Sequence, residues 1–280
     1  MSLKIAIASG KGGTGKTTIA VNMALSLENV QLIDCDVENP NGHLFLGKEL
    51  EELEEVNLTV PLIDKSKCTN CGKCAEFCRY NALVTFKNDT LFFPEMCHGC
   101  GGCTLVCPEK AITEVPRSIG KIYRAKVSGM EFLSGLLNIG EPMATPIIKR
   151  LKSHIDDSKK VIMDSPPGTA CPVIETMSDA DFVILVTEPT PFGLHDLKLA
   201  VDVVRMMEIP FGVIVNRMGS GDGRVQEYCT SQDIELLMEI PQSQEIAELY
   251  SKGIPFTREM PEWRDRFIRL HESIERKVAQ

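Results

Sequence analysis

Residues 10–17 read Gly-Lys-Gly-Gly-Thr-Gly-Lys-Thr, between a short apolar run at residues 3–8 and a segment, residues 17–27, with helical apolar spacing. Strand, glycine-rich turn and helix in this order form the context of a phosphate-binding loop. The N–H groups of such a loop bind phosphate, its second lysine reaches the outer phosphates, and its last hydroxyl binds magnesium. The candidate nucleotide-binding residues are Gly10, Gly12, Gly13, Thr14, Gly15, Lys16, Thr17 and Thr18.

The rest of the chain alternates apolar runs with amphipathic segments. We expect further strands at residues 30–33, 161–163, 182–187, 211–215 and 234–239. We expect helices at residues 145–155, 194–207, 243–251 and 262–277. Strands that alternate with helices of this length predict an α/β fold, with a mostly parallel sheet covered by helices on both faces.

Eight of the eleven cysteines form two copies of the pattern C-x2-C-x2-C-x3-C, 29 residues apart, and Pro108 follows the second copy. This spacing is typical of cubane 4Fe–4S clusters, and with two copies the fourth cysteine of each binds the other cluster. Zinc sites use paired C-x2-C units instead, and a single cluster with spare cysteines is the other alternative. The expected ligand sets are Cys68, Cys71, Cys74 with Cys107, and Cys97, Cys100, Cys103 with Cys78.

The cysteine repeat interrupts the α/β pattern. We expect an inserted domain at residues 61–114, with a hairpin formed by residues 84–86 and 91–93, and a nucleotide-binding domain formed by residues 1–60 and 115–280. A nucleotide site and two clusters would then share one polypeptide.

Composition limits the possible partners. The formal charge of −9 argues against nucleic acid as the main partner, because binding its phosphates requires a positive surface. No run of 18 apolar residues is present, so we expect no membrane span. The residues after Met1 do not resemble an export signal, and abundant cysteine without one indicates metal ligation rather than disulfides. The expected location is the cytoplasm.

Lys11 stands directly after the first glycine of the loop. A lysine at this place marks the deviant Walker A loop, and the chain resembles the MinD, ParA and nitrogenase iron-protein superfamily of ATPases. The resemblance covers both flanks of the cysteine repeat. It implies magnesium-dependent hydrolysis of ATP to ADP, open to stimulation by a partner. It also implies an ATP-dependent homodimer, in which Lys11 reaches the phosphates bound by the other subunit.

The same resemblance implies roles for acidic residues at strand ends. Asp34 and Asp36 look like the family's acidic pair near the attacking water and the magnesium, with Thr17 and Asp36 as magnesium ligands. Asp164 looks like the Walker B aspartate, and Gly168, four residues later, would offer an N–H to the γ-phosphate.

Three further residues match positions at which the family contacts the nucleotide. Asn41 corresponds to an asparagine that contacts it across the dimer, and Asn216 and Arg217 lie where the family reads adenine. Taken singly, a capping or turn role is the more ordinary explanation of such residues. Their order and spacing together carry the resemblance.

The inserted segment resembles a dicluster ferredoxin, which implies that nucleotide state gates electron transfer to a redox partner protein. One alternative is an iron–sulfur cluster carrier of the Mrp type, which would deliver clusters to an acceptor. Such carriers share a bridging cluster through a C-x-x-C pair, whereas Cys171 and Cys229 are isolated and Cys35 lies on an apolar strand. A redox-sensing regulatory ATPase is the other alternative. We expect no cluster role for Cys171.

Overall fold

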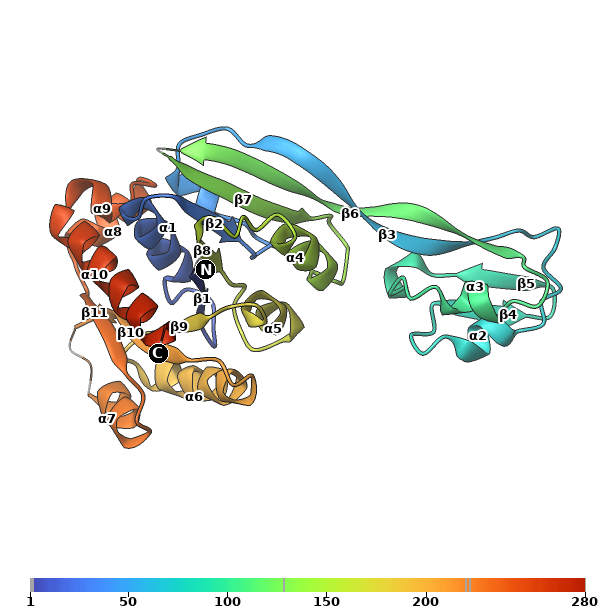
Figure 1. Cartoon of the computed structure of the whole chain (residues 1–280). Coiled ribbons are helices and arrows are strands. Elements are labelled where there is room, and N and C mark those ends of the chain that lie inside the picture. Colours follow the sequence, from blue (N-terminus) through green and yellow to red (C-terminus); the bar gives the residue numbers. More distant parts are fainter. Residues whose placement is uncertain (1–2, 128, 220, 222, 280) are drawn as a thin grey trace.

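The computed structural model describes residues 3–127, 129–219, 221 and 223–279. Within these residues, a nine-stranded sheet has the order β11-β10-β9-β1-β8-β2-β7-β6-β3 (Figure 1). Neighbouring strands from β11 to β7 are parallel, whereas β6 and β3 join antiparallel at one edge. The mostly parallel sheet is therefore confirmed. The strands are β1 (Lys4–Ala8), β2 (Val30–Asp34), β3 (Glu51–Ile63), β6 (Ile112–Val127), β7 (Met130–Leu137), β8 (Lys160–Asp164), β9 (Phe182–Thr187), β10 (Phe211–Met218) and β11 (Leu236–Pro241).

Helices cover both faces of the sheet, as expected. A core that contains Ile19, Met23 and Phe267 lies on one face, and a core that contains Ile147 and Val201 lies on the other. The helices of the first face are α1 (Lys16–Ser26), α8 (Gln244–Ser251), α9 (Phe256–Glu259) and α10 (Pro261–Val278). Those of the second are α4 (Thr145–Lys152), α5 (Cys171–Met177), α6 (Pro191–Met206) and α7 (Arg224–Ser231). In the described part of the chain, no helix has the length and apolar character needed to cross a bilayer.

Strands β3 and β6 continue beyond the sheet as a two-stranded arm that carries a smaller lobe (Figure 1). The 13 residues of β3 span roughly 40 Å at about 3.3 Å per residue. The acidic composition of residues 49–55 gives no strand signal in the sequence. The structure explains the strand, because Glu52 pairs with Lys121 at 2.7 Å and Glu51 with Arg124 at 3.8 Å across the arm.

The lobe repeats its backbone conformation with the period of the sequence. Left-handed φ angles recur at Asn70 and Gly99 (54° and 65°), at Gly72 and Gly101 (79° and 70°), and at Asn81 and Lys110 (53° and 50°). The short helices α2 (Lys73–Phe77) and α3 (Gly102–Val106) each begin after one of these glycines. The expected hairpin is confirmed as β4 (Leu83–Phe86) and β5 (Asp89–Phe92). The domain boundaries at 60/61 and 114/115 stay a prediction, and they fall inside β3 and β6.

Helix α4 lies very close to the root of the arm. A Cβ on Gly120 of β6 would lie 2.3 Å from Ile147 Cδ1, and one on Gly135 of β7 would lie 2.9 Å from Ile147 Cγ2. These glycines lack side chains where the helix approaches the strands. Ile147 is fully buried between them.

We expect Gly135→Ala to lower the free energy of unfolding by about 1–3 kcal/mol, which is the typical cost of overpacking a filled core. The added Cβ would lie 2.6 Å from Val37 Cγ1 as well as close to Ile147. Denaturant unfolding measures the cost. The double variant Gly135→Ala/Val37→Ala should lose less stability than the two single variants together, and strictly additive losses would contradict this packing.

Candidate functional site

The candidate nucleotide site lies at the carboxyl ends of β1, β2 and β8. These strands are parallel, and their register places Asp34 directly beside Asp164. The glycine-rich loop follows β1 and leads into α1, which begins at Lys16. Open α/β sheets bind ligands at this edge, because the loops that leave parallel strands meet there.

A cavity of about 440 Å³ occupies this edge and has room for a nucleotide. It brings together most of the residues expected to bind one, from the loop, from the segment after β2 and from the end of β10. Those that line it are Gly12, Gly13, Gly15, Lys16, Thr17, Thr18, Asp36, Asn41, Asn216 and Arg217. The cavity also has a wall from α8, including Tyr250 and Ile246, which the sequence motifs did not indicate.

Lys16 is held within the loop. Its Nζ donates to Ser9 Oγ at 3.0 Å, and Ser9 Oγ in turn donates to the carbonyl of Lys11 at 2.6 Å. Burial lowers the pKa of Lys16, while the carboxylates of Asp164 and Asp36 oppose that shift. A buried ammonium with few local partners suits a ligand that brings its own negative charge.

Three carboxyl groups of the site interact with one another or with this lysine. Burial raises the pKa of Asp34 to about 7, although the N–H groups of Asp36, Asn41 and Gly42 donate to its carboxylate at 3.2, 3.1 and 2.9 Å. Burial also raises the pKa of Asp164, and neighbouring Asp34 raises it further. The pKa of Asp36 is raised by burial against the effect of Lys16. Together these groups disfavour full ionisation unless a cation joins them.

The site contains buried polar atoms that have no hydrogen-bond partner among the described residues. They include both carboxyl oxygens of Asp164, Oγ1 of Thr14 and Oδ1 of Asn41. Such atoms are costly unless a ligand satisfies them. Oxygen donors grouped in this way fit a magnesium ion and a nucleotide, since magnesium prefers carboxylate, hydroxyl and phosphate oxygens.

Asn216 and Arg217, near the end of β10, both have hydrogen-bond or ion-pair partners in the site. Asn216 Nδ2 donates to Thr14 O at 2.8 Å, and Asn216 Oδ1 accepts from Arg217 N at 2.9 Å. Glu188, directly after β9, pairs with Arg217 at 2.5 Å and with Lys11 at 3.2 Å. The carboxylate of Glu188 thus pairs with two positively charged side chains of the predicted site. No sequence motif singled it out, because the pairing depends on the neighbouring positions of β9, β1 and β10.

Gly10, Lys11, Thr14, Asp34, Asp164 and Gly168 do not line the cavity. The two glycines among them make close contacts elsewhere. Gly168 N donates to Ser9 O at 3.0 Å, so its N–H is engaged with the loop. A Cβ on Gly10 would lie 2.1 Å from the carbonyl oxygen of Asp196, so this glycine permits close contact with α6. Their expected contacts with the nucleotide stay predictions.

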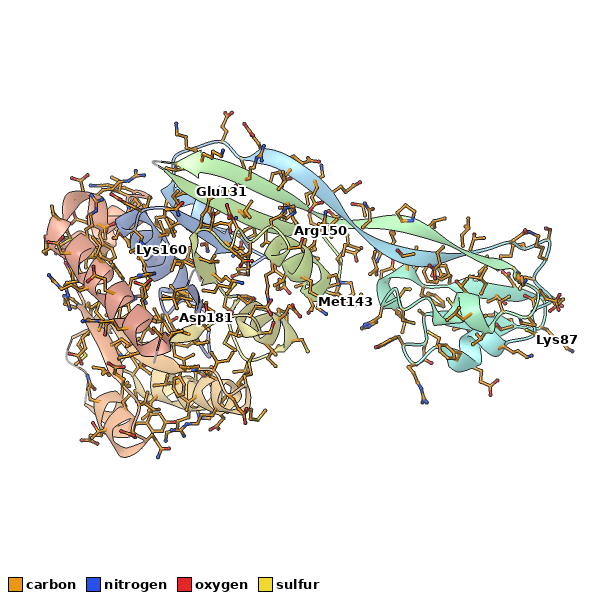
Figure 2. The ribbon with its side chains drawn as sticks, in the orientation of Figure 1. Lys87, Glu131, Met143, Arg150, Lys160 and Asp181 are labelled. Carbon is orange, nitrogen blue, oxygen red and sulfur yellow. The ribbon has the colours of Figure 1, made fainter. Side chains whose placement is uncertain are left out.

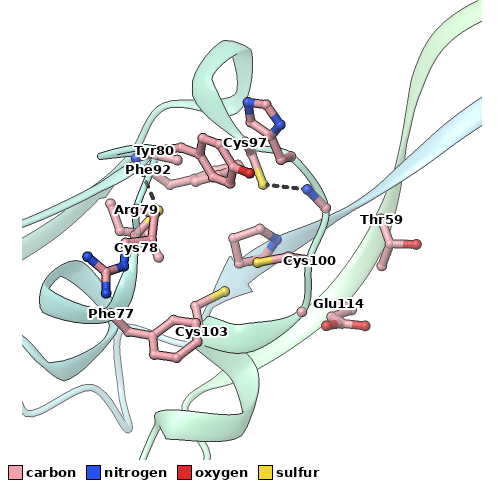
Figure 3. A pocket seen from close by; sticks show the side chains of 16 residues that line it. Thr59, Phe77, Cys78, Arg79, Tyr80, Phe92, Cys97, Cys100, Cys103 and Glu114 are labelled. Carbon is pink, nitrogen blue, oxygen red and sulfur yellow. Dashed lines mark hydrogen bonds between the residues drawn. The ribbon is translucent and has the colours of Figure 1, made fainter. Parts of the chain in front are cut away.

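The cysteines of the repeat surround two cavities in the lobe. One is lined by Cys78, Cys97, Cys100 and Cys103 (Figure 3). The other is lined by Cys68, Cys71, Cys74 and Cys107. These are the two crossed sets expected from the sequence.

We call the first cavity proximal and the second distal, from their places along the arm. Thr59 and Pro61 of β3 line the proximal cavity, whereas Ile63, where β3 ends, lines the distal one. Since β3 runs from the sheet to the lobe, the proximal cavity lies nearer the main body.

The thiols have repeated backbone partners. Cys78 Sγ accepts from Ala82 N at 3.4 Å, and Cys107 Sγ accepts from Ala111 N at 3.3 Å. In the proximal cavity, Cys97 Sγ accepts from Gly99 N at 3.5 Å (Figure 3). N–H donors of this kind stabilise thiolates and tune the potentials of iron–sulfur clusters.

No three cysteine, histidine or acidic side chains of the described residues approach closely enough to hold a single metal ion. The four thiols of each cavity surround a space instead. Four thiolates around a cubane each bind a different corner, so this donor set fits a cluster. Burial raises the pKa of Cys74, Cys97 and Cys103, so these thiols favour their neutral form until a cation binds.

The three remaining cysteines lie apart from the lobe. Cys35 and Cys229 are buried in the second core, and burial raises the pKa of Cys229 to about 11. Cys171 is exposed at the start of α5. No second cysteine stands beside it in the chain to form a C-x-x-C pair.

Several known proteins are similar to this chain in sequence or in fold. An uncharacterized protein of Methanocaldococcus jannaschii is 34% identical over 260 residues, which cover 91% of each chain. An iron–sulfur cluster carrier protein of Pyrococcus horikoshii is 25% identical, over 90% of this chain and 78% of its own. The fold resembles that of the septum site-determining protein MinD of P. horikoshii, complexed with Mg-ADP (TM-score 0.58, 22% identity, 98% of this chain and 96% of that one).

The family model that describes the CobQ/CobB/MinD/ParA nucleotide-binding domain matches residues 5–256. The match begins in β1 and ends at the start of α9, so it includes every strand of the main sheet. This chain is therefore a member of the CobQ/CobB/MinD/ParA nucleotide-binding family.

Proposed function

We propose that this protein is a magnesium-dependent ATPase that couples its nucleotide state to electron transfer through two 4Fe–4S clusters in the lobe. The observation that carries the proposal is the grouping of the eight repeat cysteines into two cavities of four. Each cavity draws three cysteines from one copy of the repeat and one from the other. The clusters, when bound, supply one-electron redox chemistry. A redox protein that exchanges electrons with the lobe is the implied partner.

The nucleotide half of the function depends on residues of the 440 Å³ cavity. Loop N–H groups and Lys16 would bind the phosphates of ATP, and Thr17 and Asp36 would hold magnesium, with Asp164 nearby. Asp34, with its pKa raised to about 7, would accept a proton from the attacking water more readily than an exposed aspartate. Lys11 would leave Glu188 and stabilise phosphate charge in a second subunit, which makes an ATP-dependent homodimer the active form.

Carriage of iron–sulfur clusters is the second candidate, because relatives at 25% identity over 90% of this chain carry that name. A carrier must hold a cluster at an exposed site shared between subunits, so that an acceptor can take it. Cys171 is the only exposed cysteine outside the lobe among the described residues. A redox-sensing regulatory ATPase is the remaining alternative.

Midpoint potentials measured with and without ATP test the leading proposal. The protein is prepared without oxygen, and the reduced clusters are followed by electron paramagnetic resonance during a redox titration. We expect ATP to shift at least one potential, since a nucleotide that moves the lobe changes the surroundings of its thiolates. Midpoint potentials that are the same with and without ATP would favour the cluster carrier or the redox-sensing ATPase.

Anaerobically purified protein should contain about eight iron and eight sulfide per chain, as two cubanes require. Cys78→Ser should halve the iron by removing the cluster of the proximal cavity, although Cys78 belongs to the first copy of the repeat. Cys229→Ser is the matched control and should leave the iron unchanged. Stoichiometric zinc in place of iron would rule out electron transfer, and loss of the distal cluster in Cys78→Ser would disprove the crossed ligation.

Lys16→Ala should abolish ATP binding, because Lys16 lines the cavity of its own subunit and would bind the phosphates there. Lys11→Ala should bind ATP almost as well as the wild type but lose hydrolysis and ATP-dependent dimerisation. Calorimetry, phosphate release and sedimentation measure these three properties. A wild-type rate of hydrolysis in Lys11→Ala would show that this lysine has no role across the dimer.

Cys171→Ser should retain the full iron content, the spectra and the ATPase activity, because both cluster cavities have four thiols without it. Iron analysis and sedimentation with ATP make the comparison. Loss of roughly a fifth of the iron, as one bridging cubane per dimer would give, together with a changed monomer–dimer balance, would support a bridging cluster and the carrier function.

A further inference from the structure

Helix α4 is packed between α5 and the root of the arm (Figure 1). It contacts β7, β6 and β3 on one side and α5 on the other. Helix α5 begins three residues after Gly168, at the end of the segment that follows β8. A short helix thus links the edge of the nucleotide site to the strands that carry the lobe.

The contact with α5 is made by a buried charge. The side chain of Lys152 is only 4% exposed, and its Nζ pairs with Asp179 at 2.9 Å and with Glu175 at 3.6 Å. It also donates to Ser178 Oγ at 2.9 Å and to the carbonyl of Glu175. All these acceptors lie in α5 or directly after it. Movement of α5 alone would leave a buried ammonium without partners, so α4 is expected to move with it.

The contact with the arm is also ionic. Arg150 of α4 lies beside the root of the arm (Figure 2). It binds Glu54 of β3 through both carboxylate oxygens, at 2.8 and 2.5 Å, and Nε2 of His154 lies 2.5 Å from the same carboxylate. A bidentate ion pair of this kind fixes the orientation of α4 relative to β3 as well as the distance between them. The fully buried Ile147 fits between Gly120 and Gly135 on the same side.

The loop before α4 is connected to the lobe through Arg117 of β6. Glu141 binds Arg117 of β6 through two hydrogen bonds, and Arg117 Nη2 also donates to the carbonyl of Pro94 at 3.2 Å. Pro94 lies three residues before Cys97, which lines the proximal cavity. The side chains of Arg117 and Glu141 are mostly buried. Lys152, at the end of α4, is thus connected to α5. Glu141, in the loop before α4, is connected through Arg117 to the lobe.

The first segment after β2 makes a parallel connection. Val37, next to Asp36, accepts at its carbonyl from Leu137 N of β7 at 2.8 Å. Val37 also packs close to Gly135. The segment after β2 thus contacts the root of the arm directly, whereas the segment after β8 is connected to it through α5 and α4.

We infer that α4 transmits the nucleotide state to the lobe, with Lys152 as the positioning residue toward α5 and Glu54 and Glu141 as the positioning residues toward the arm. This inference depends on the proposed function only in assuming that ATP changes the segment after β8. It assigns a route from the phosphates to the proximal cavity through residues that contact neither ligand.

The test uses the full chain with its clusters and compares Lys152→Met with Lys149→Met. Lys149 lies on the same helix, but its side chain is 65% exposed and its ion pair with Glu175 is long, at 3.7 Å. Its loss should therefore leave the contact between α4 and α5 intact. The main readout is hydrogen–deuterium exchange of residues 94–101 and of β3 and β6, with and without ATP. The second is the ATP-induced shift in cluster potential.

In the wild type and in Lys149→Met, ATP should change exchange in the arm and lobe. In Lys152→Met that change should fall by at least half, while ATP affinity and iron content stay within about twofold of the wild type. Glu54→Gln and Glu141→Gln should give the same loss, with Glu52→Gln as control because Glu52 pairs with Lys121 within the arm. They keep the test decisive if Lys152→Met does not fold.

Each outcome separates the inference from the proposed function. If Lys152→Met, Glu54→Gln and Glu141→Gln all keep the full ATP-induced change in exchange, the role of α4 is overturned and the electron-transfer proposal is left intact. A response that requires Lys152, without any shift in potential, would support the role of α4 and overturn gated electron transfer. No response in the wild type would overturn both.

Discussion

The parallel register of β2 with β8 is the constraint on which the site depends. It sets Asp34 against Asp164 in the interior of the sheet, next to the loop that follows β1. Two buried carboxyl groups at neighbouring positions repel each other and are poorly solvated, so a cation must stabilise their charged forms. Lys16 supplies part of the positive charge, and a magnesium ion bound together with a nucleotide would supply the rest. The position of the glycine-rich loop, the helix α1 and the segments after β2 and β8 all follow from this edge.

The main sheet could be predicted because its signals are local. Each of the parallel strands β1, β2, β8, β9, β10 and β11 is a short apolar run with a helix nearby in sequence, and the structure confirms them with shifts of a few residues. The arm could not be predicted in the same way. Glu51 and Glu52 lie in a strand that pairs with β6, where Arg124 and Lys121 form ion pairs with them from many residues later in the chain. Strands β6 and β7 pair locally with each other, with Val127 opposite Met130, but their other neighbours, β3 and β2, are distant in the chain.

The two sites differ in how far their geometry could be foreseen. The cysteine spacing predicts which thiols belong together, and the cavities of the lobe group them in those sets. The repeat of left-handed residues, such as Gly72 and Gly101, shows why the spacing is so informative, since equal backbone turns carry equal ligand positions. By contrast, Glu188 and the α8 wall of the nucleotide cavity come from the order of the strands, which no local pattern reveals.

The lobe enters and leaves the main body through two strands that are hydrogen-bonded neighbours, and Ile63 stands opposite Ile112 where they reach it. The two ends of the inserted segment are therefore adjacent in space. A segment with adjacent ends can be exchanged without stretching the sheet that carries it, because the remaining hairpin needs only a turn to close. The arm is thus an attachment site: a different domain could be inserted at its end, and the same nucleotide-binding body would hold it at the same distance and orientation.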